Sequence, residues 1–278
     1  MAGAVAAGGR QAVAGRRFGG LAFVFLWLPA GLLLGFILLP LLRTAAAQSW
    51  GGLSSVAAMS DVQAAIWLSV ECAAITALAA AVLGTPLAYL LARGQGPGYR
   101  LVEALVDLPL AVPHTVAGIA LLFVFGRDGL VGSLLAPLGL QFWGTAAGIV
   151  IAMLFVSVPY MVNSAQLGFA GVDPRLEKVA RTLGATPLQV LGRVDLPLAW
   201  RGVLTGAVLT YARAISEIGS VMVLAYYPMT APVKIYELYL ETGLGQASAM
   251  AVLLLLVTLS TFLVMRGLVH GTWRAGAP

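Results

Sequence analysis

Long apolar runs, separated by short polar segments, fill most of this sequence. A helix needs about 20 apolar residues to cross the hydrocarbon core of a bilayer, and six runs are close to that length or longer. The six runs are Leu21–Leu42, Val62–Ala92, Leu101–Phe125, Phe142–Leu167, Leu198–Leu224 and Gln246–Leu268. The pattern predicts an all-α membrane protein with six transmembrane helices within residues 21–270.

The longest polar segment, residues 172–197, lies between the fourth and fifth of these runs. Asp173 is a typical N-cap residue and Pro174 suits the first position of a helix. Gly184 is a typical residue to end that helix, and Thr186 with Pro187 predicts a second helix through Leu191. The segment is therefore expected to form a helical hairpin.

An apolar stripe runs along the first helix of the predicted hairpin, with the basic residues largely off it. The stripe consists of Leu176, Val179, Ala180 and Leu183. A stripe of this kind favours a surface that docks onto another protein, because long loops are usually functional. The alternative is a basic loop that is simply solvated.

The composition agrees with a polytopic membrane protein and excludes an ordinary soluble domain. The chain has 278 residues, of which 60% are hydrophobic and only 10% charged, with a mean hydropathy of +0.95. Its single cysteine, Cys72, lies within an apolar run, so it forms no intramolecular disulfide.

The distribution of basic residues predicts the orientation in the membrane. If the N-terminus is inside, twelve of the 16 basic residues fall in cytoplasmic segments, against three outside, which satisfies the positive-inside rule. The twelve are Arg10, Arg16, Arg17, Arg93, Arg100, Arg175, Lys178, Arg181, Arg193, Arg201, Arg266 and Arg274. Both termini and the hairpin are then cytoplasmic, with residues 1–20 a disordered arm and residues 271–278 a tail. The net charge of +5 thus reflects topology and not a nucleic-acid partner.

No catalytic, metal-binding or nucleotide-binding motif is recognisable in the sequence. The phosphate-binding pattern GxxxxGK[ST] is absent, and the two histidines, His114 and His270, are far apart and without other ligand residues. The chain is therefore expected to hold no cofactor and not to be an enzyme. It also shows no strong internal repeat, so six spans would have to dimerise to enclose a transport pathway.

A few polar residues within the apolar runs are candidates for a pathway. His114 follows Pro109 and Pro113, and it either lines a path or is satisfied by a nearby carbonyl group. Arg213 and Glu217 are spaced to meet on one helix face, either as an ion pair that fixes the fifth span or as groups that contact an anion. Glu71 in the second span is either protonated or an alternative partner for Arg213 across helices.

The hairpin carries a resemblance to a known family. Gly184, followed at a fixed distance by Val194-Asp195-Leu196-Pro197, resembles the cytoplasmic "EAA" loop of ABC importer permeases. The resemblance implies that the hairpin docks into a groove of an ATPase subunit. The residues implied are Glu177, Lys178, Val179, Ala180, Leu183, Gly184, Leu188 and Pro197. Where the family has Glu-Ala-Ala, this sequence has Lys178-Val179-Ala180, with Glu177 one place early.

Three further segments resemble the molybdate/tungstate branch of that family, with sulfate and thiosulfate permeases as relatives. They read PHTVAGIALL (113–122), ARAISEIG (212–219) and AYYPMTAPVKIYE (225–237). The resemblance implies a type I importer fold: a homodimer in the cell membrane, two ABC ATPase subunits that bind ATP-Mg, and an extracytoplasmic substrate-binding protein. His114, Arg213 and Glu217 are then the candidates for the oxyanion pathway.

The predicted outer segment after the fifth span is rich in tyrosine and proline. Its tyrosines either anchor the spans at the interface or, together with Lys234, receive the binding protein. The candidates for docking are Tyr227, Lys234 and Tyr236, and residues 233–240 are expected to form a short helix. A secondary transporter or a membrane scaffold remains the alternative, but neither has a use for the cytoplasmic hairpin.

Overall fold

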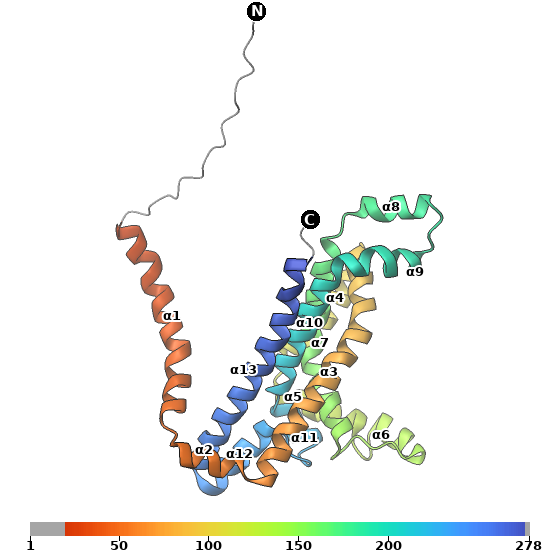
Figure 1. The fold of residues 1–278 in the computed structure, drawn as a ribbon. Coiled ribbons are helices and arrows are strands. Elements are labelled where there is room, and N and C mark those ends of the chain that lie inside the picture. Colours follow the sequence, from red (N-terminus) through yellow and green to blue (C-terminus); the bar gives the residue numbers. More distant parts are fainter. Residues whose placement is uncertain (1–19, 276–278) are drawn as a thin grey trace, which may run out of the picture. The chain divides into compact units, whose positions relative to one another are not determined.

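The computed structural model describes residues 20–275, and all regular secondary structure in that range is helical (Figure 1). The described chain divides into two units, one ending at Ala47 and one beginning at Gln48. The first unit holds α1 (Gly20–Ala46). The second holds α2 (Trp50–Ala57), α3 (Ser60–Arg93), α4 (Pro97–Ala111), α5 (His114–Phe125), α6 (Leu130–Leu135), η1 (Ala136–Leu138), α7 (Ala146–Ala170), α8 (Pro174–Thr182), α9 (Pro187–Val190), η2 (Leu191–Asp195), α10 (Leu196–Ile215), α11 (Gly219–Leu224), α12 (Ala231–Thr242) and α13 (Leu244–Ala275).

Helix α1 is apolar along nearly its whole length, and its described side chains are almost all exposed. A helix that is hydrophobic all round needs lipid or another protein chain to cover it. This helix matches the first predicted span, extended to Ala46. The arm predicted at residues 1–20 lies outside the described residues except for Gly20.

The core of the second unit forms where α3, α7 and α10 pack together. Small residues make the close packing possible: α3 buries Ala73, Ala77 and Ala80 at helical spacing. A Cβ placed on Gly202 of α10 would lie only 2.7 Å from the Cα of Gly168 in α7. The two backbones are thus in direct contact at this crossing.

The predicted third span, residues 101–125, is not one helix. It is divided into α4 and α5, with Val112 extended at φ −80° and ψ 128°. Pro113 is the reason, because it lacks an N–H and disfavours helical geometry at the residue before it.

The predicted fifth span, residues 198–224, is also interrupted. Helix α10 ends at Ile215, and the separate helix α11 begins at Gly219. No proline lies in this break, so contacts with other elements must stabilise it. Glu217 lies in the break itself, just after α10 instead of within it.

Length and hydropathy identify five helical segments of the described chain that can cross a membrane. They are Trp27–Ala46, Ser60–Arg93, His114–Leu138, Ala146–Ala170 and Leu244–Gly267. The all-α membrane class is confirmed. The count of six is not reached, because α10, the counterpart of the fifth predicted span, does not meet the same criteria. Helix α13 continues through Ala275, so most of the tail predicted at residues 271–278 is helical.

The elements of the second unit lie toward two ends of its helical bundle. Helices α8 and α9 lie at the end where α3 finishes and α10 begins, and α2, α11 and α12 lie toward the other end (Figure 1). We call these the hairpin end and the opposite end.

Candidate functional site

Helix α8 begins and ends as its sequence predicts. The Asp173 carboxylate accepts a hydrogen bond of 2.9 Å from the backbone N–H of Arg175. At the other end, the N–H of Gly184 donates to Arg181 O and that of Ala185 to Ala180 O, the paired bonds of a Schellman cap. Gly184 has φ +88°, a conformation that glycine adopts without strain. The turn between the two hairpin helices therefore depends on Gly184.

The second half of the hairpin is a short helix that continues into the bundle. The Thr186 hydroxyl accepts from the N–H of Gln189, and the Gln189 side chain accepts from the N–H of Thr186, forming a capping box. Helix α9 ends at Val190, near the predicted Leu191, and then widens into the π-helical turn η2. Because η2 runs directly into α10, the hairpin is joined to a long helix of the core.

The exposed surface of the hairpin carries apolar side chains. Leu183 and Leu188, on either side of the turn, are 83% and 80% exposed, and Val179 is 57% exposed. Lys178, Gly184 and Pro197 are also exposed, whereas Ala180 is partly buried. This predicted set is thus mostly at the surface, where a partner can reach it.

Glu177 is the exception among the predicted hairpin residues. It is 8% exposed and its Oε1 lies 2.5 Å from Nε of Arg93, the last residue of α3. Its carboxylate therefore faces the bundle and not the exposed surface. Asp195 of η2 is fully buried nearby, 3.6 Å from Nη2 of Arg93. Burial raises the pKa of Asp195, and the adjacent Glu177 charge raises it further.

The structure brings His114, Arg213 and Glu217 into one cluster. Nη2 of Arg213 lies 2.7 Å from Oε2 of Glu217 and 3.0 Å from Nε2 of His114. Nδ1 of His114 is 3.4 Å from the same Glu217 oxygen. The predicted ion pair is confirmed even though Glu217 lies beyond the end of α10. The alternative partner, Glu71, is exposed on α3.

The cluster is buried at one side and open at the other. The Glu217 side chain is 2% exposed, whereas that of His114 is 49% exposed. Oε1 of Glu217 accepts hydrogen bonds of 2.9 Å from both the N–H and the hydroxyl of Ser220, in the first turn of α11. The carboxylate thus stabilises the helix break and holds Arg213 at the same time.

Glycine residues allow α5 and α11 to approach each other beside this cluster. A Cβ on Gly219 would lie 2.6 Å from Cβ of His114, and a Cβ on Gly118 would lie 2.7 Å from Cβ of Val223. Gly219 therefore lets α5 pass close to the start of α11.

At the opposite end, α12 matches the short helix predicted at residues 233–240. Tyr227 and Tyr236 are exposed, but the side chain of Lys234 is largely buried, at 13% exposure. Nζ of Lys234 lies 2.8 Å from Asp61 and 2.5 Å from Glu237. Burial opposes the positive charge, but these hydrogen bonds outweigh it, so the pKa of Lys234 is raised. Lys234 joins α12 to α3, so of the three predicted docking residues Tyr227 and Tyr236 are exposed and Lys234 is not.

A row of polar pairs links α4 and α7 between the hairpin end and the His114 cluster. The Asn163 amide donates to Asp107 at 2.8 Å, and the Gln166 amide donates to Glu103 at 2.6 Å. Asp107 is exposed and the other three are partly exposed. Polar groups of this kind do not face lipid without cost, so they indicate a face covered by protein or water.

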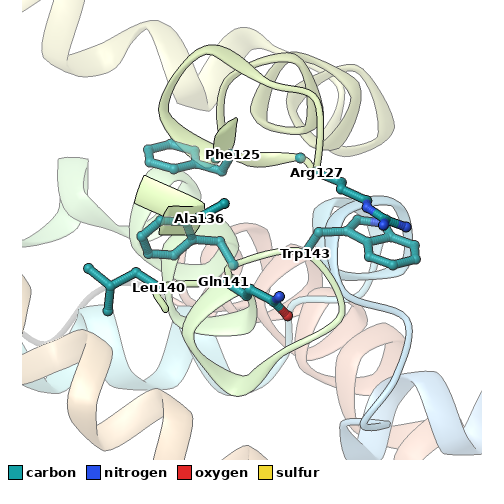
Figure 2. Close-up of a pocket in the computed structure, with 9 residues that line it drawn as sticks. Phe125, Arg127, Ala136, Leu140, Gln141 and Trp143 are labelled. Carbon is teal, nitrogen blue, oxygen red and sulfur yellow. The ribbon is translucent and has the colours of Figure 1, made fainter. Parts of the chain in front are cut away.

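A cavity of about 440 Å³ lies between the end of α5, the α6–η1 segment and the start of α7 (Figure 2). Phe125, Phe142 and Trp143 supply aromatic walls, and Arg127 and Gln141 are its polar lining residues. Figure 2 shows the Arg127 guanidinium beside the Trp143 ring. None of the residues predicted from the sequence line this cavity.

Sequence reasoning missed several residues that shape these sites. Arg93 and Asp195 were noted only as a basic residue and as a variable position of the loop signature, and Ser220 was not noted. The partners of Arg93 and Asp195 come from distant segments, so no local spacing marks them. Ser220 lies only three residues from its partner Glu217, so in that case a local signal was overlooked. The feature that could have marked Asp195 is its position, because it is an acidic residue directly before the Leu-Pro with which the fifth apolar run begins.

Comparison with known proteins agrees with this arrangement. Residues 84–274 match the family model described as "Binding-protein-dependent transport system inner membrane component". A molybdate/tungstate transport system permease protein of Thermococcus kodakarensis is 43% identical over 205 residues, covering 74% of this chain and 78% of that protein. A probable molybdenum ABC transporter permease protein of Haloferax volcanii is 39% identical over 244 residues, covering 88% and 89%.

Among solved structures, a bacterial alginate ABC transporter in complex with an alginate-bound periplasmic protein contains a similar chain. The TM-score is 0.70 at 17% identity, over 88% of this chain and 92% of that one, which establishes a common fold. A permease of this kind is a transport component and not an enzyme. The chain therefore belongs to the family of binding-protein-dependent transport system inner membrane components, the multi-pass permease subunits of ABC importers.

Proposed function

We propose that this chain is the permease subunit of an ATP-driven importer for a tetrahedral oxyanion, molybdate or tungstate. The names of the relatives support the substrate class, since both cited relatives carry molybdenum or molybdate in their names. The observation that carries the ATP-driven part is the exposed apolar surface of the hairpin. A soluble ATPase with a complementary groove would cover it.

The exposed surface of the hairpin is the proposed docking site for the ATPase. Leu183 and Leu188 flank the Gly184 turn and are more than three-quarters exposed. Large exposed apolar side chains that stand together mark protein interaction sites. Lys178 is exposed on α8 and supplies a charged contact in place of the family's glutamate. Two such subunits, one for each permease chain, would bind ATP-Mg, and the permease itself would hold no cofactor.

The orientation follows from the charge distribution. The hairpin, its basic residues and both termini are placed in the cytoplasm, and α2 and α12 face outward. Tyr227 and Tyr236 then form the exposed outer surface that receives an extracytoplasmic binding protein. Lys234 contributes to this surface by fixing α12 to α3 through Asp61.

The transport pathway is proposed to form between two copies of this chain. The row of polar pairs on α4 and α7 leads from the hairpin end toward His114, and it needs a covering that is not lipid. A second copy placed against this face would enclose a polar path. The open side of His114 and Arg213 would then provide a polar contact and a cationic contact for an anion, with Glu217 holding Arg213 in place.

The energetics favour an ATP-driven mechanism over a channel. Moving one elementary charge against the membrane potential costs about 2.3 kcal/mol per 100 mV, so a dianion costs about 4.6 kcal/mol before any concentration gradient. A channel cannot accumulate such an ion in a cell that is negative inside. A secondary transporter would need several coupled protons.

Reconstitution tests this proposal directly. Proteoliposomes that hold the permease alone should take up no oxyanion, with or without a pH gradient. Uptake should require the ATPase, internal ATP and the external binding protein together. Accumulation by the isolated permease, driven by a gradient, would refute the proposal and favour a secondary transporter.

The sulfate or thiosulfate permease function is the second candidate. Sulfate, molybdate and tungstate are similar tetrahedral dianions, so a pathway of one arginine and one histidine does not distinguish them. Isothermal calorimetry of the cognate binding protein with each anion decides between the two candidates.

A further inference from the structure

Arg93, the last residue of α3, lies where four segments of the hairpin end meet. Its guanidinium contacts both halves of the hairpin and the end of α7. No local pattern in the sequence indicates this role. The contacts point to a function for Arg93 beyond membrane topology.

The first contact of Arg93 is with the hairpin itself. Nε lies 2.5 Å from Oε1 of Glu177 in the first turn of α8. Helix α8 otherwise packs mainly against α9 and η2, which belong to the same hairpin segment. The Glu177–Arg93 pair is therefore a direct tie between α8 and a long helix of the bundle.

The second set of contacts is with the C-terminal end of α7. Nη1 donates to Phe169 O at 2.9 Å, and Nη2 lies 3.5 Å from Val172 O. The last carbonyl groups of a helix lack partners within the helix and carry a partial negative charge, so a cation at this position is favourable. Arg93 thus fixes the point at which the chain leaves α7 and enters the hairpin.

The third contact is with the return of the hairpin into the bundle. Nη2 lies 3.6 Å from Oδ1 of Asp195, the last residue of η2, immediately before α10. One guanidinium therefore contacts the exit from α7, the first helix of the hairpin and the entry to α10. Only a planar group with several N–H donors can satisfy partners in so many directions, and a lysine ammonium cannot.

Burial raises the energetic cost of breaking these ion pairs. Glu177 and Asp195 are both buried, and the side chain of Arg93 is 21% exposed. Displacement of α8 breaks the Glu177–Arg93 ion pair, and a change at Arg93 leaves the buried Asp195 without its cation, so both changes are unfavourable. The charged contacts therefore define one orientation of the hairpin relative to α3 and α7.

We propose that Arg93 is a positioning residue that holds the hairpin in the orientation needed to transmit ATPase movement to α3, α7 and α10. The proposal rests on the proposed function for its coupling role. The ion pair makes the hairpin and the ends of these helices move as one body. Without it, α8 loses its ion pair with α3, and ATP hydrolysis is less tightly linked to transport.

Two variants and a control test this role in the full complex. Arg93→Lys keeps the charge but cannot contact all partners, and Glu177→Gln keeps the size but removes the charge. Arg100→Lys is the matched control, because Arg100 is exposed in the first turn of α4 at the same end of the bundle. For each variant, hydrogen exchange is measured on the permease without the ATPase, and oxyanion uptake per ATP hydrolysed is measured in proteoliposomes.

Arg93→Lys and Glu177→Gln should accelerate exchange of the α8 amides and leave those of α12 unchanged. Uptake per ATP hydrolysed should fall by roughly three- to thirtyfold, the range for changes within a coupling network. Arg100→Lys should match the wild type in both measurements. A variant that loses the ATPase while its α8 amides exchange faster also supports the proposal, because a displaced hairpin no longer fits its partner.

Wild-type exchange of α8 in the Arg93→Lys variant would overturn the proposal, as would wild-type uptake per ATP. This outcome is distinct from failure of the proposed function. If the wild-type permease binds no ATPase, the proposed function fails, while the exchange measurement on the permease alone still decides whether Arg93 positions the hairpin.

Discussion

Replacing Arg213 with alanine removes the cation from a carboxylate that has almost no contact with solvent. The Glu217 side chain is 2% exposed and lies 2.7 Å from Arg213. Removal of one partner of a buried ion pair costs about 3–5 kcal/mol. Oε1 of Glu217 keeps its two hydrogen bonds from Ser220. The free energy of unfolding should therefore fall by an amount near the lower end of this range, about 3 kcal/mol.

The double variant Arg213→Ala/Glu217→Gln should be more stable than the single variant. The neutral amide no longer needs a cation, and its oxygen can still accept a hydrogen bond from the Ser220 N–H. The loss relative to the wild type should then be about 1–2 kcal/mol, the value of the remaining lost hydrogen bonds. The losses of the two single variants, added together, should therefore exceed the loss of the double variant.

Unfolding of the purified permease by SDS in mixed micelles measures these free energies directly. Arg127→Ala serves as the control, since Arg127 is exposed and lies near the aromatic cavity at the opposite end. Additive losses for Arg213→Ala and Glu217→Gln would show that the two side chains act independently. An Arg213→Ala variant as stable as the control would refute the reasoning altogether.

Two further predictions concern the hairpin end and its packing. Gly202→Ala should lower the free energy of unfolding by about 1–3 kcal/mol, because its Cβ would overlap Gly168. Gly267 has open space around it, so Gly267→Ala should be neutral or slightly stabilising. Both variants are measured in the same SDS titration. Asp195→Asn should be at least as stable as the wild type at neutral pH, because burial and Glu177 raise the pKa of Asp195 and its charged form is unfavourable. A raised pKa in the folded state means that the wild type gains stability as pH falls through that value, so the difference should shrink in acid. A variant less stable than the wild type at neutral pH would contradict this sign.

The hairpin could be predicted well because its signals are local. Asp173, Gly184 and Thr186 each act on backbone groups within a few residues, and the structure places all three at the ends of helices as expected. The approximate positions of the apolar spans were predictable for a similar reason, since hydropathy is a property of each run by itself.

The helix breaks were predicted less well, for two different reasons. Pro113 carries a local signal for the break between α4 and α5, but the apolar run continues through it and suggests one span. The break between α10 and α11 has no such signal. It depends on Glu217, which contacts Ser220, and on Gly219, which lies against His114, and these contacts exist only in the folded protein.

The role of individual charges was the hardest to predict. Glu177 was expected at the docking surface, because the family signature places a glutamate nearby, yet it is buried against Arg93. Lys234 was expected to be available to a partner, yet its ammonium is shared between Asp61 and Glu237. A sequence shows which residues are charged but not which of them meet, and the pairing decides what remains exposed.

Several polar side chains in this mainly apolar chain share one physical task at the ends of helices. Arg93 donates to the carbonyl of Phe169 in the last turn of α7, and Glu217 accepts from an N–H in the first turn of α11. The hydroxyl of Ser69 in α3 accepts from the N–H of Ala231 at the start of α12. A helix that ends within or near a bilayer leaves backbone groups that water cannot satisfy, and each such group is costly. A side chain from a neighbouring element that satisfies it also fixes the position of that helix end. The break between α10 and α11 is therefore compatible with a stable membrane protein, because Glu217 binds an N–H that the break exposes. If such a partner separates from its helix end, that end loses its hydrogen bond. Movement of this bundle should therefore displace whole helices and not bend single helices.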